Sequence, residues 1–322
     1  MLARPAQRES CRISVVICVY TEQRWDDMLA AIGSVARQSH RAHETIVVVD
    51  HNPGLRSRLE AELRQSDLPG VIVAANREAQ GLSGGKNTGV AMASGDIVAF
   101  LDDDAVAEAD WLTSFADTYA QAGVSGVGGM TLPRWDLGRP RWFPREFDWV
   151  VGCNYIGMAV SPQPARNLLG GNASFRRETF DLVGGFSTGV GRSRGGLPLG
   201  CEETEFCIRL QQASPDTTLL IDDRAVIWHR VPAARGRFSY FITRCYAEGL
   251  SKAQISRSVG AADGLRSERR HALATLPAGV GRNLAAPLRG DVSGLRRAGA
   301  ILAGLGAAAA GYTIGRVLRE AT

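Results

Sequence analysis

Lysine is scarce in this sequence, and paired cysteines and repeats are missing from it. Only two of the 37 basic residues are lysine, Lys86 and Lys252, which in a chain rich in Ala, Gly and Arg indicates a compositional bias rather than a functional signal. The six cysteines form no C-x-x-C pair and no regular framework, which predicts reduced, structural thiols. No internal repeat occurs, and no low-complexity tract precedes the Ala/Gly-rich C-terminal segment, so a repeat architecture is not expected.

Residues 1–12 lack the apolar core of a secretory signal peptide, so we expect the chain to begin in the cytoplasm. Charge is unevenly distributed, although the net charge is only +4. The segment from Arg230 to the C-terminus has fifteen Arg or Lys against five Asp or Glu, a net charge of +10, which leaves −6 for residues 1–229. We expect the acidic part and the basic part to have different functions.

Strand and helix patterns alternate through the first hundred residues, and each strand pattern is a continuous apolar run. The runs that predict strands lie at 12–20, 44–50, 70–76 and 96–102, and helical spacing occupies 24–38, 55–65 and 83–94. This alternation predicts a parallel sheet covered by helices on both faces. Such a sheet binds its ligands at the carboxyl ends of its strands.

The rest of the chain is less regular and ends in a basic helical region. Gly-rich strands are expected at 123–135 and 168–178, a helix that starts with acids at 200–212, one or two strands at 217–230, and an amphipathic helix at 237–257. We therefore predict one domain over 10–230 and a helical region over 231–322.

Three adjacent aspartates, Asp102 to Asp104, directly follow the fourth strand pattern. Carboxylates repel one another, and a divalent cation held by Asp102 and Asp104 would offset that repulsion. Mg²⁺ and Mn²⁺ prefer one or two carboxylates together with phosphate oxygens. The alternative interpretation is a solvated acidic turn that caps the following helix.

Three further segments hold candidate functional side chains, each with a structural alternative. The Gly-rich stretch 81–89, with Lys86, could bind a phosphate at a helix start, although it lacks the P-loop spacing and could be a flexible loop. His229 follows a strand pattern, where it is either a metal ligand suited to Mn²⁺ or a histidine with an ordinary structural role. The glutamates within 202–205 begin a helix, where they either favour the helix dipole or supply a general base.

The ordered set of motifs resembles one known family, the inverting family 2 glycosyltransferases with the GT-A fold. The likeness spans residues 12–257, and the motifs that produce it are "SVVICVYTE", "ETIVVVDHN", "GGKNTGVAMASGDIVAFLDDDA", "GGNASFRRETFDLVGGF", "CEETEFCIRL" and "VIWHR". The resemblance implies an α/β fold with a Rossmann-like, mostly parallel sheet and helices on both faces. It also implies that residues 10–105 bind the nucleotide sugar and that residues 106–230 bind the acceptor.

The resemblance implies roles for individual residues. Those expected to contact the nucleotide sugar are Thr21 and Glu22 after the first strand, Asp50 at the base (typically uracil), Lys86, Asp102 near the ribose, and Asp103. Asp104 is expected to hold the metal, Mn²⁺ or Mg²⁺, with Asp102 and His229 as further ligands. Glu203 is expected to be the general base that deprotonates the acceptor hydroxyl, so that one displacement inverts the sugar.

Two departures from the family pattern leave the identity of the nucleotide open. Cys18 stands where the first strand commonly has Pro, and His51-Asn52-Pro53 replaces the usual Asp-Gly-Ser. We expect a UDP-sugar, with dTDP- and GDP-sugars as alternatives. The Q-x-x-R-W motif of processive synthases is absent after the acidic helix, so transfer of one or a few sugars is expected.

The C-terminal region contains eighteen uncharged residues, 298–315, between flanking arginines. Their number suits a membrane span, but Ala and Gly dominate, so a helix on an anionic membrane surface or a packed tail helix is expected instead. We therefore expect a cytoplasmic enzyme, peripheral on the inner face of the plasma membrane, that acts on a glycan or lipid-linked acceptor in cell-surface synthesis. Nucleic-acid binding is not expected, because no nucleic-acid motif accompanies the basic charge.

Two other functions remain open at this point. A sugar-phosphate nucleotidyltransferase also joins a Gly-rich loop to aspartates, but that loop would directly follow the first strand, where this chain has "YTEQRW". A non-catalytic relative would only bind a nucleotide sugar, and the intact Asp104, Glu203 and His229 argue against it.

Overall fold

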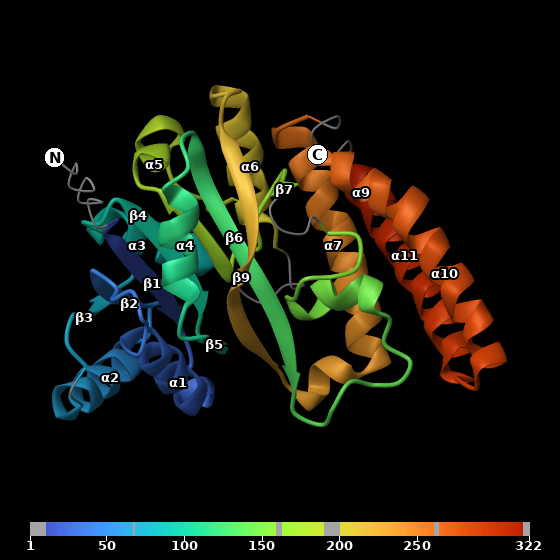
Figure 1. Cartoon of the computed structure of the whole chain (residues 1–322), viewed down its shortest axis with the longest axis horizontal. Helices are drawn as coiled ribbons and strands as arrows, with labels where there is room; N and C mark the ends of the chain where they lie inside the picture. The colour runs from blue at the N-terminus through green and yellow to red at the C-terminus, as the bar shows by residue number, and fades with distance from the viewer. Residues whose placement is uncertain (1–10, 67, 159–162, 190–199, 261–263, 318–322) are drawn as a thin grey trace, which may run out of the picture.

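A single mixed sheet forms the centre of the computed structural model, which describes residues 11–66, 68–158, 163–189, 200–260 and 264–317. The strands lie in the order β3-β2-β1-β4-β8-β6-β9-β5, and β7 pairs with β9 (Figure 1). Their bounds are β1 (Ile13–Val19), β2 (Glu44–Val49), β3 (Val71–Ala75), β4 (Ile97–Asp102), β5 (Ala105–Ala107), β6 (Val124–Trp135), β7 (Gln163–Pro164), β8 (Asn172–Arg176) and β9 (Thr218–Val231).

The first four strands of this order are parallel, as the alternation of strand and helix patterns predicts. Strand β8 is antiparallel to both β4 and β6, and β9 runs parallel to β6. The segment 217–230, for which one or two strands were expected, forms the single strand β9, whose far end pairs with β5. The ends of β4 and β9 are thereby brought together.

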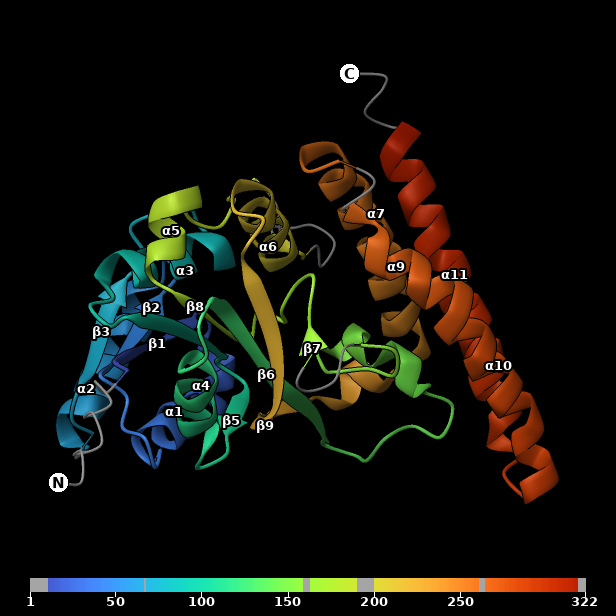
Figure 2. The ribbon, with the colours of Figure 1, turned by 45° about the horizontal axis from the view of Figure 1, so that its top comes forward.

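Helices cover both faces of the sheet, which confirms the expected fold class (Figure 2). The α-helices are α1 (Trp25–Ala36), α2 (Pro53–Gln65), α3 (Leu82–Met92), α4 (Trp111–Tyr119), α5 (Glu178–Val183), α6 (Glu202–Ala213), α7 (Phe238–Ser258), α9 (Arg266–Arg270), α10 (Leu276–Ala285) and α11 (Ser293–Val317). Short 3₁₀ turns are η1 (Glu22–Arg24), η2 (Arg145–Val151), η3 (Ala233–Gly236) and η5 (Ala286–Arg289), and η4 (His271–Thr275) is a π turn.

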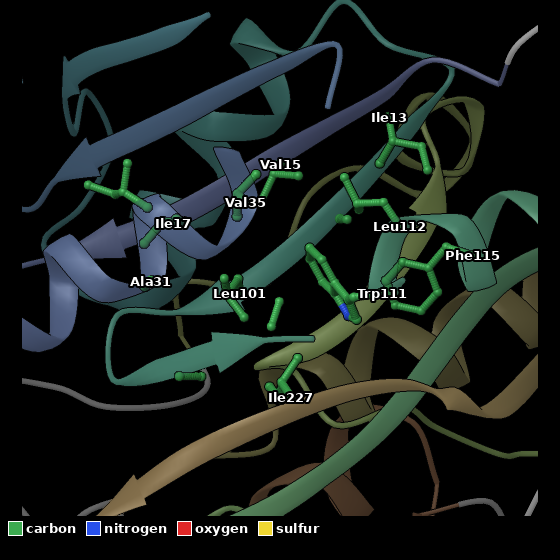
Figure 3. Close-up of a cluster of buried hydrophobic side chains, with 14 of the residues drawn as sticks. Ile13, Val15, Ile17, Ala31, Val35, Leu101, Trp111, Leu112, Phe115 and Ile227 are labelled. Atoms are coloured by element: carbon green, nitrogen blue, oxygen red, sulfur yellow. The ribbon is translucent and has the colours of Figure 1, made fainter. Parts of the chain in front are cut away.

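The alternation of side chains along β1 explains why both faces are covered. Ile13, Val15 and Ile17 point to the face covered by α1 and α4, where Trp111 and Phe115 complete the core (Figure 3). The residues between them point to the other face, which α3, α5 and α6 cover. Burial on both faces is why the strands of this half are continuously apolar.

The C-terminal helices pack tightly against one another and against η2. A Cβ atom added to Gly249 of α7 would lie 2.1 Å from the Ala308 carbonyl oxygen of α11, and one added to Gly311 would lie 2.1 Å from the Tyr246 carbonyl oxygen. Gly304 of α11 similarly approaches the ring of Phe147. These glycines let α11 lie directly on α7, with α10 along its side (Figures 1 and 2).

Helix α11 is also long and apolar enough to cross a membrane by length and composition, although a buried helix can meet the same criteria. It contains the uncharged stretch 298–315 singled out in the sequence. Of the residues in its most apolar window, 28% are buried inside the protein.

Candidate active site

The three aspartates lie where β4 gives way to β5, at the predicted edge of the sheet. Strand β4 ends at Asp102, and Ala105 of β5 pairs with His229 of β9. This pairing brings the His229 Nε2 atom to 3.1 Å from Asp104 Oδ1, with both side chains buried. One ligand atom each from Asp102, Asp104 and His229 lie within 4.8 Å of one another.

The donor set of this triad fits a divalent cation. Two carboxylates supply hard oxygen ligands, and the imidazole suits Mn²⁺ and other transition metals. The second ring nitrogen of His229, Nδ1, is buried and has no hydrogen-bond partner among the described residues.

Arginines compensate the remaining charge of the aspartates. Arg24, at the end of η1, lies 2.5 Å from Asp103 Oδ1 and 3.1 Å from Asp104 Oδ2. Arg235 of η3 lies 3.6 Å from the same Asp104 oxygen. The arginines therefore bind one oxygen of Asp104, while the other oxygen faces His229.

The pKa values of the two buried aspartates, Asp103 and Asp104, are shifted in opposite directions. Burial raises the pKa of Asp103 to about 7, helped by its acidic neighbours and opposed by Arg24. Burial would also raise the pKa of Asp104, but the His229 hydrogen bond and the charges of His229, Arg24 and Arg235 hold it well below its usual range. Asp104 is therefore ionised at neutral pH, as a metal ligand must be.

A glycine pair before β8 closes the site from the opposite side. A Cβ atom on Gly171 would lie 2.1 Å from Asp102 Oδ2, and one on Gly170 would lie 2.7 Å from Lys86 Nζ and 3.1 Å from Glu203 Cδ. Residues 170–171 thus lie between Asp102, Lys86 and Glu203. Any side chain at Gly171 would displace the Asp102 carboxylate or the loop.

The structure distinguishes the three glutamates of α6. Glu202 binds Lys86, with 3.1 Å between Oε1 and Nζ, and Glu205 forms an ion pair with Arg209 at 2.9 Å. Glu203 accepts a long hydrogen bond, 3.4 Å, from the Gly170 N–H and lines a cavity of about 460 Å³ shared with Asp102 and Lys86. Of the three, Glu203 is the one for which the described residues show no ion pair.

The pKa values of Glu203 and Lys86 are both raised, but by different causes. Burial raises the pKa of Glu203 to about 7, and the Glu202 carboxylate adds to this while the Lys86 ammonium opposes it. Burial would lower the pKa of Lys86, but Glu202 and Glu203 raise it overall, so that Lys86 remains charged. A carboxylate with a pKa near neutrality is suited to accept a proton.

Comparison with known proteins shows the family of the chain. The family described as "Glycosyl transferase family 2" matches residues 14–184. The chain belongs to this family. A curated relative, the glucosyl-dolichyl phosphate glucuronosyltransferase of Haloferax volcanii, is 33% identical over 242 residues, 75% of this chain and 76% of the relative. The succinoglycan biosynthesis protein ExoM of Rhizobium meliloti is 24% identical over 255 residues, 77% of this chain and 76% of that protein.

Solved structures support the GT-A fold of this family 2 enzyme. The mannosyltransferase PcManGT of Pyrobaculum calidifontis, solved with GDP-Man and Mn²⁺, has a TM-score of 0.56 and 16% identity, and covers 91% of this chain and 86% of that one. GalNAc-T7, solved with UDP, GalNAc and Mn²⁺, has a TM-score of 0.55 and 16% identity, covering 82% of this chain and 55% of that one. At these identities the likeness establishes the fold alone.

The other residues assigned by resemblance lie along the same edge of the sheet, at the ends of β1 and β2. Asp50 accepts hydrogen bonds from Asn76 Nδ2 at 2.7 Å and from the Gly81 N–H at 3.0 Å, so it also holds the Gly-rich loop before α3. Thr21 caps η1, accepting from the Gln23 N–H, and Glu22 is exposed. Their contact with a nucleotide stays a prediction.

Sequence reasoning missed Arg24, Arg235 and Gly171. Arg24 could have been found from the sequence, because it is a basic residue shortly after the first strand, β1, and β1 lies next to β4 in the sheet. No local pattern pointed to Arg235, which reaches Asp104 only because η3 follows the end of β9.

We expect Gly171→Ala to reduce sugar transfer by on the order of 10²-fold, because a new methyl group would move Asp102 from its position in the triad. Transfer rates would be measured together with thermal unfolding. Gly281→Ala is the control, since nothing lies within 4 Å of its added Cβ. A fully active, normally folded Gly171→Ala protein would show that the close approach to Asp102 has no functional importance.

Proposed function

We propose that this family 2 enzyme transfers one sugar from a nucleotide-diphosphate sugar to a hydroxyl group of a lipid-linked acceptor, with inversion and with a divalent metal. One observation carries the proposal: Glu203 opens onto the same cavity as Asp102, which belongs to the Asp102–Asp104–His229 triad. The relative from Haloferax volcanii, named for a dolichyl phosphate substrate, supports a lipid-linked acceptor. Family membership favours this function over the nucleotidyltransferase alternative.

In this proposal the protein's own groups divide the chemistry between them. Asp102, Asp104 and His229 hold the metal, which, when bound, neutralises charge on the donor diphosphate. Arg24 and Arg235 add fixed positive charge near the leaving diphosphate. Glu203, oriented by the Gly170 N–H, accepts the proton of the acceptor hydroxyl as its oxygen attacks the sugar from the face opposite the nucleotide.

A donor-release assay tests the proposal and its metal requirement. Purified protein is incubated with UDP-, GDP- and dTDP-sugars, with and without Mn²⁺ or Mg²⁺, and free nucleotide is measured. We expect one class of nucleotide sugar, UDP-sugars before the other two, to release its nucleotide only when metal is present. Asp104→Ala should abolish release and weaken Mn²⁺ binding measured by electron paramagnetic resonance, with exposed Asp117→Asn as the control. Full activity in excess EDTA would contradict the proposal.

We expect Glu203→Gln to retain donor binding and to lose turnover by on the order of 10²-fold or more. Because protonation removes the base, kcat/KM of the native enzyme should fall as the pH drops below about 7, the pKa of Glu203. Glu205→Gln is the control, since Glu205 already pairs with Arg209. If Glu205→Gln were inactive and Glu203→Gln active, the assignment within α6 would be wrong.

Peripheral membrane binding forms part of the same proposal. Large apolar side chains are exposed around the turn between α10 and α11, namely Leu284, Leu288, Val292 and Leu295. Leu288 is 90% exposed and Val292 is 68% exposed. Arg289 and Arg296 are exposed beside them, and basic residues near an anionic leaflet contribute about 1 kcal/mol each. We therefore propose that this turn inserts among the headgroups of an anionic membrane.

Flotation with liposomes that contain anionic lipid tests this surface. We expect the protein to float at low salt and to detach as salt rises, because surface charge is screened beyond about 10 Å at 0.1 M ionic strength. Leu288→Ser combined with Val292→Ser should abolish flotation. Leu182→Ser, an exposed leucine on α5, should leave it unchanged. Equal flotation of all variants would refute insertion of the turn.

A further inference from the structure

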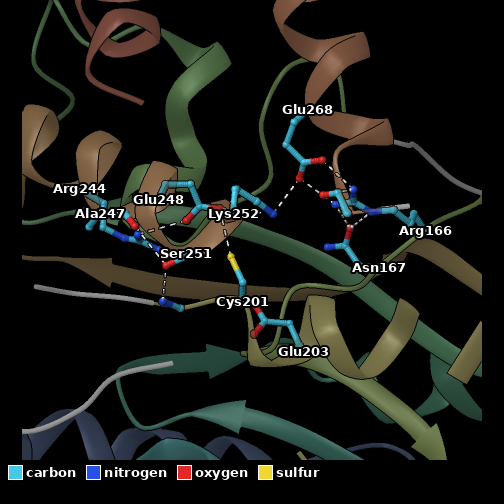
Figure 4. Close-up of polar contacts among 12 residues, drawn as sticks. Arg166, Asn167, Cys201, Glu203, Arg244, Ala247, Glu248, Ser251, Lys252 and Glu268 are labelled. Carbon is cyan, nitrogen blue, oxygen red and sulfur yellow. Dashed lines mark hydrogen bonds and ion pairs between the residues drawn. The ribbon is translucent and has the colours of Figure 1, made fainter. Parts of the chain in front are cut away.

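A group of charged side chains lies beside Glu203 and takes no part in the proposed chemistry. Arg166 binds Glu268 through two bonds, from Nη1 at 2.6 Å and from Nη2 at 2.8 Å, and Lys252 Nζ lies 2.7 Å from the same carboxylate (Figure 4). Lys252 is also 3.5 Å from Glu248, which Arg244 binds at 3.2 Å. We call these five residues the cation cluster, because its three positive charges exceed its two carboxylates.

The cation cluster is poorly exposed and lines the cavity that contains Glu203. The side chains of Arg166 and Lys252 are each 11% exposed, whereas Glu268 is 30% exposed. Desolvating paired charges costs about as much as their attraction returns, so such a cluster is weak evidence for stability. Its place on the cavity wall, next to the base, instead suggests that it binds something.

The C-terminal helices contribute an apolar part of the cavity wall, beside Arg269 and His271, which also line the cavity. Leu276 of α10 and Leu305, Ala308 and Tyr312 of α11 line it, together with Trp149 of η2. The same helices expose the apolar turn described above. A ligand here would therefore meet positive charge at one end and an apolar surface, close to the membrane-binding helices, at the other.

We propose that the cavity binds an amphiphilic acceptor whose phosphate group sits between Arg166 and Lys252, with its apolar chain along α11. The Glu268 carboxylate occupies the position that we assign to that phosphate. This inference rests on the proposed function, which it deepens by naming the chemistry of the acceptor.

The geometry of Glu268 supports its exchange for a phosphate. A guanidinium that binds a carboxylate through two parallel bonds can bind two phosphate oxygens in the same way. Glu268 lies on α9, a helix of only five residues, and is more exposed than the cations that it binds. Replacing it would leave the buried cations neutralised, because a phosphate carries at least as much negative charge as a carboxylate.

Binding of small probes to the full-length protein tests this inference. Geranyl phosphate, geraniol and inorganic phosphate would be titrated by calorimetry. We expect geranyl phosphate to bind at least about tenfold more tightly than geraniol or inorganic phosphate, because only geranyl phosphate contacts both the cations and the apolar part of the cavity. Equal binding of geraniol would overturn the phosphate site, and equal binding of inorganic phosphate would overturn the amphiphile.

Two variants then separate binding from displacement. Arg166→Gln should weaken geranyl phosphate binding about tenfold or more, through loss of a two-bond charged contact. Glu268→Gln should strengthen it about threefold or more, because the site is no longer occupied by an internal carboxylate. If Glu268→Gln weakened binding as Arg166→Gln does, the inference would be wrong. Arg56→Gln and Glu60→Gln, which disrupt an ion pair on α2 outside the cavity, are the matched controls.

Metal-dependent release of nucleotide from the donor is measured for the same proteins. The Arg56 and Glu60 control variants should keep the native rate of release, since neither residue lines the cavity. Absence of release in the native protein would refute the proposed function, whereas the titrations decide the acceptor site independently.

Discussion

Mutual repulsion among Asp102, Asp103 and Asp104 is the constraint on which the site depends. Three adjacent carboxylates at a strand end are tolerated only if positive charge reaches them. The structure brings that charge from distant parts of the chain: Arg24 follows β1, and His229 and Arg235 follow one another around the end of β9. The neighbouring positions of β1 with β4, and of β9 with β5, are therefore electrostatic requirements as well as topological ones.

Much of the fold and the outline of the site could be predicted from local pattern. Continuous apolar strands separated by helical spacing fix the parallel half of the sheet, and parallel strands end at one edge, so Asp50 and Asp102 had to lie near each other. The choice of Glu203 could not be made from composition alone, since three glutamates share one helical turn. Glu202 also lines the cavity but pairs with Lys86, and Glu205 pairs with Arg209, so among the described residues Glu203 is the cavity-lining glutamate without an ion pair.

The C-terminal region shows where sequence reasoning stops. An Ala/Gly-rich helix offers no strong apolar stripe, so it was expected to lie on a membrane surface or to pack as a tail. Its glycines are informative only beside their partners: Gly311 lies against the Tyr246 carbonyl, and Gly249 against that of Ala308. Contacts between residues so far apart in the chain have no local signature. These contacts make α11 part of the cavity wall. The division of the chain into a domain over 10–230 and a helical region over 231–322 therefore stays a prediction from the sequence.

The two lysines of this lysine-poor chain both lie in the same part of the structure. Composition accounts for the preference for arginine, but both lysines are buried, and both line the cavity with Glu203. Lys86 binds Glu202 and has the Phe100 and Phe186 rings within 6 Å, whereas Lys252 joins Glu248 to Glu268. A compact ammonium group can serve several carboxylates in a confined space, where a planar guanidinium imposes its own geometry. One lysine thus lies on the side of Glu203 that we propose for the donor and the other on the proposed acceptor side, so that the proposed base lies between two positive charges.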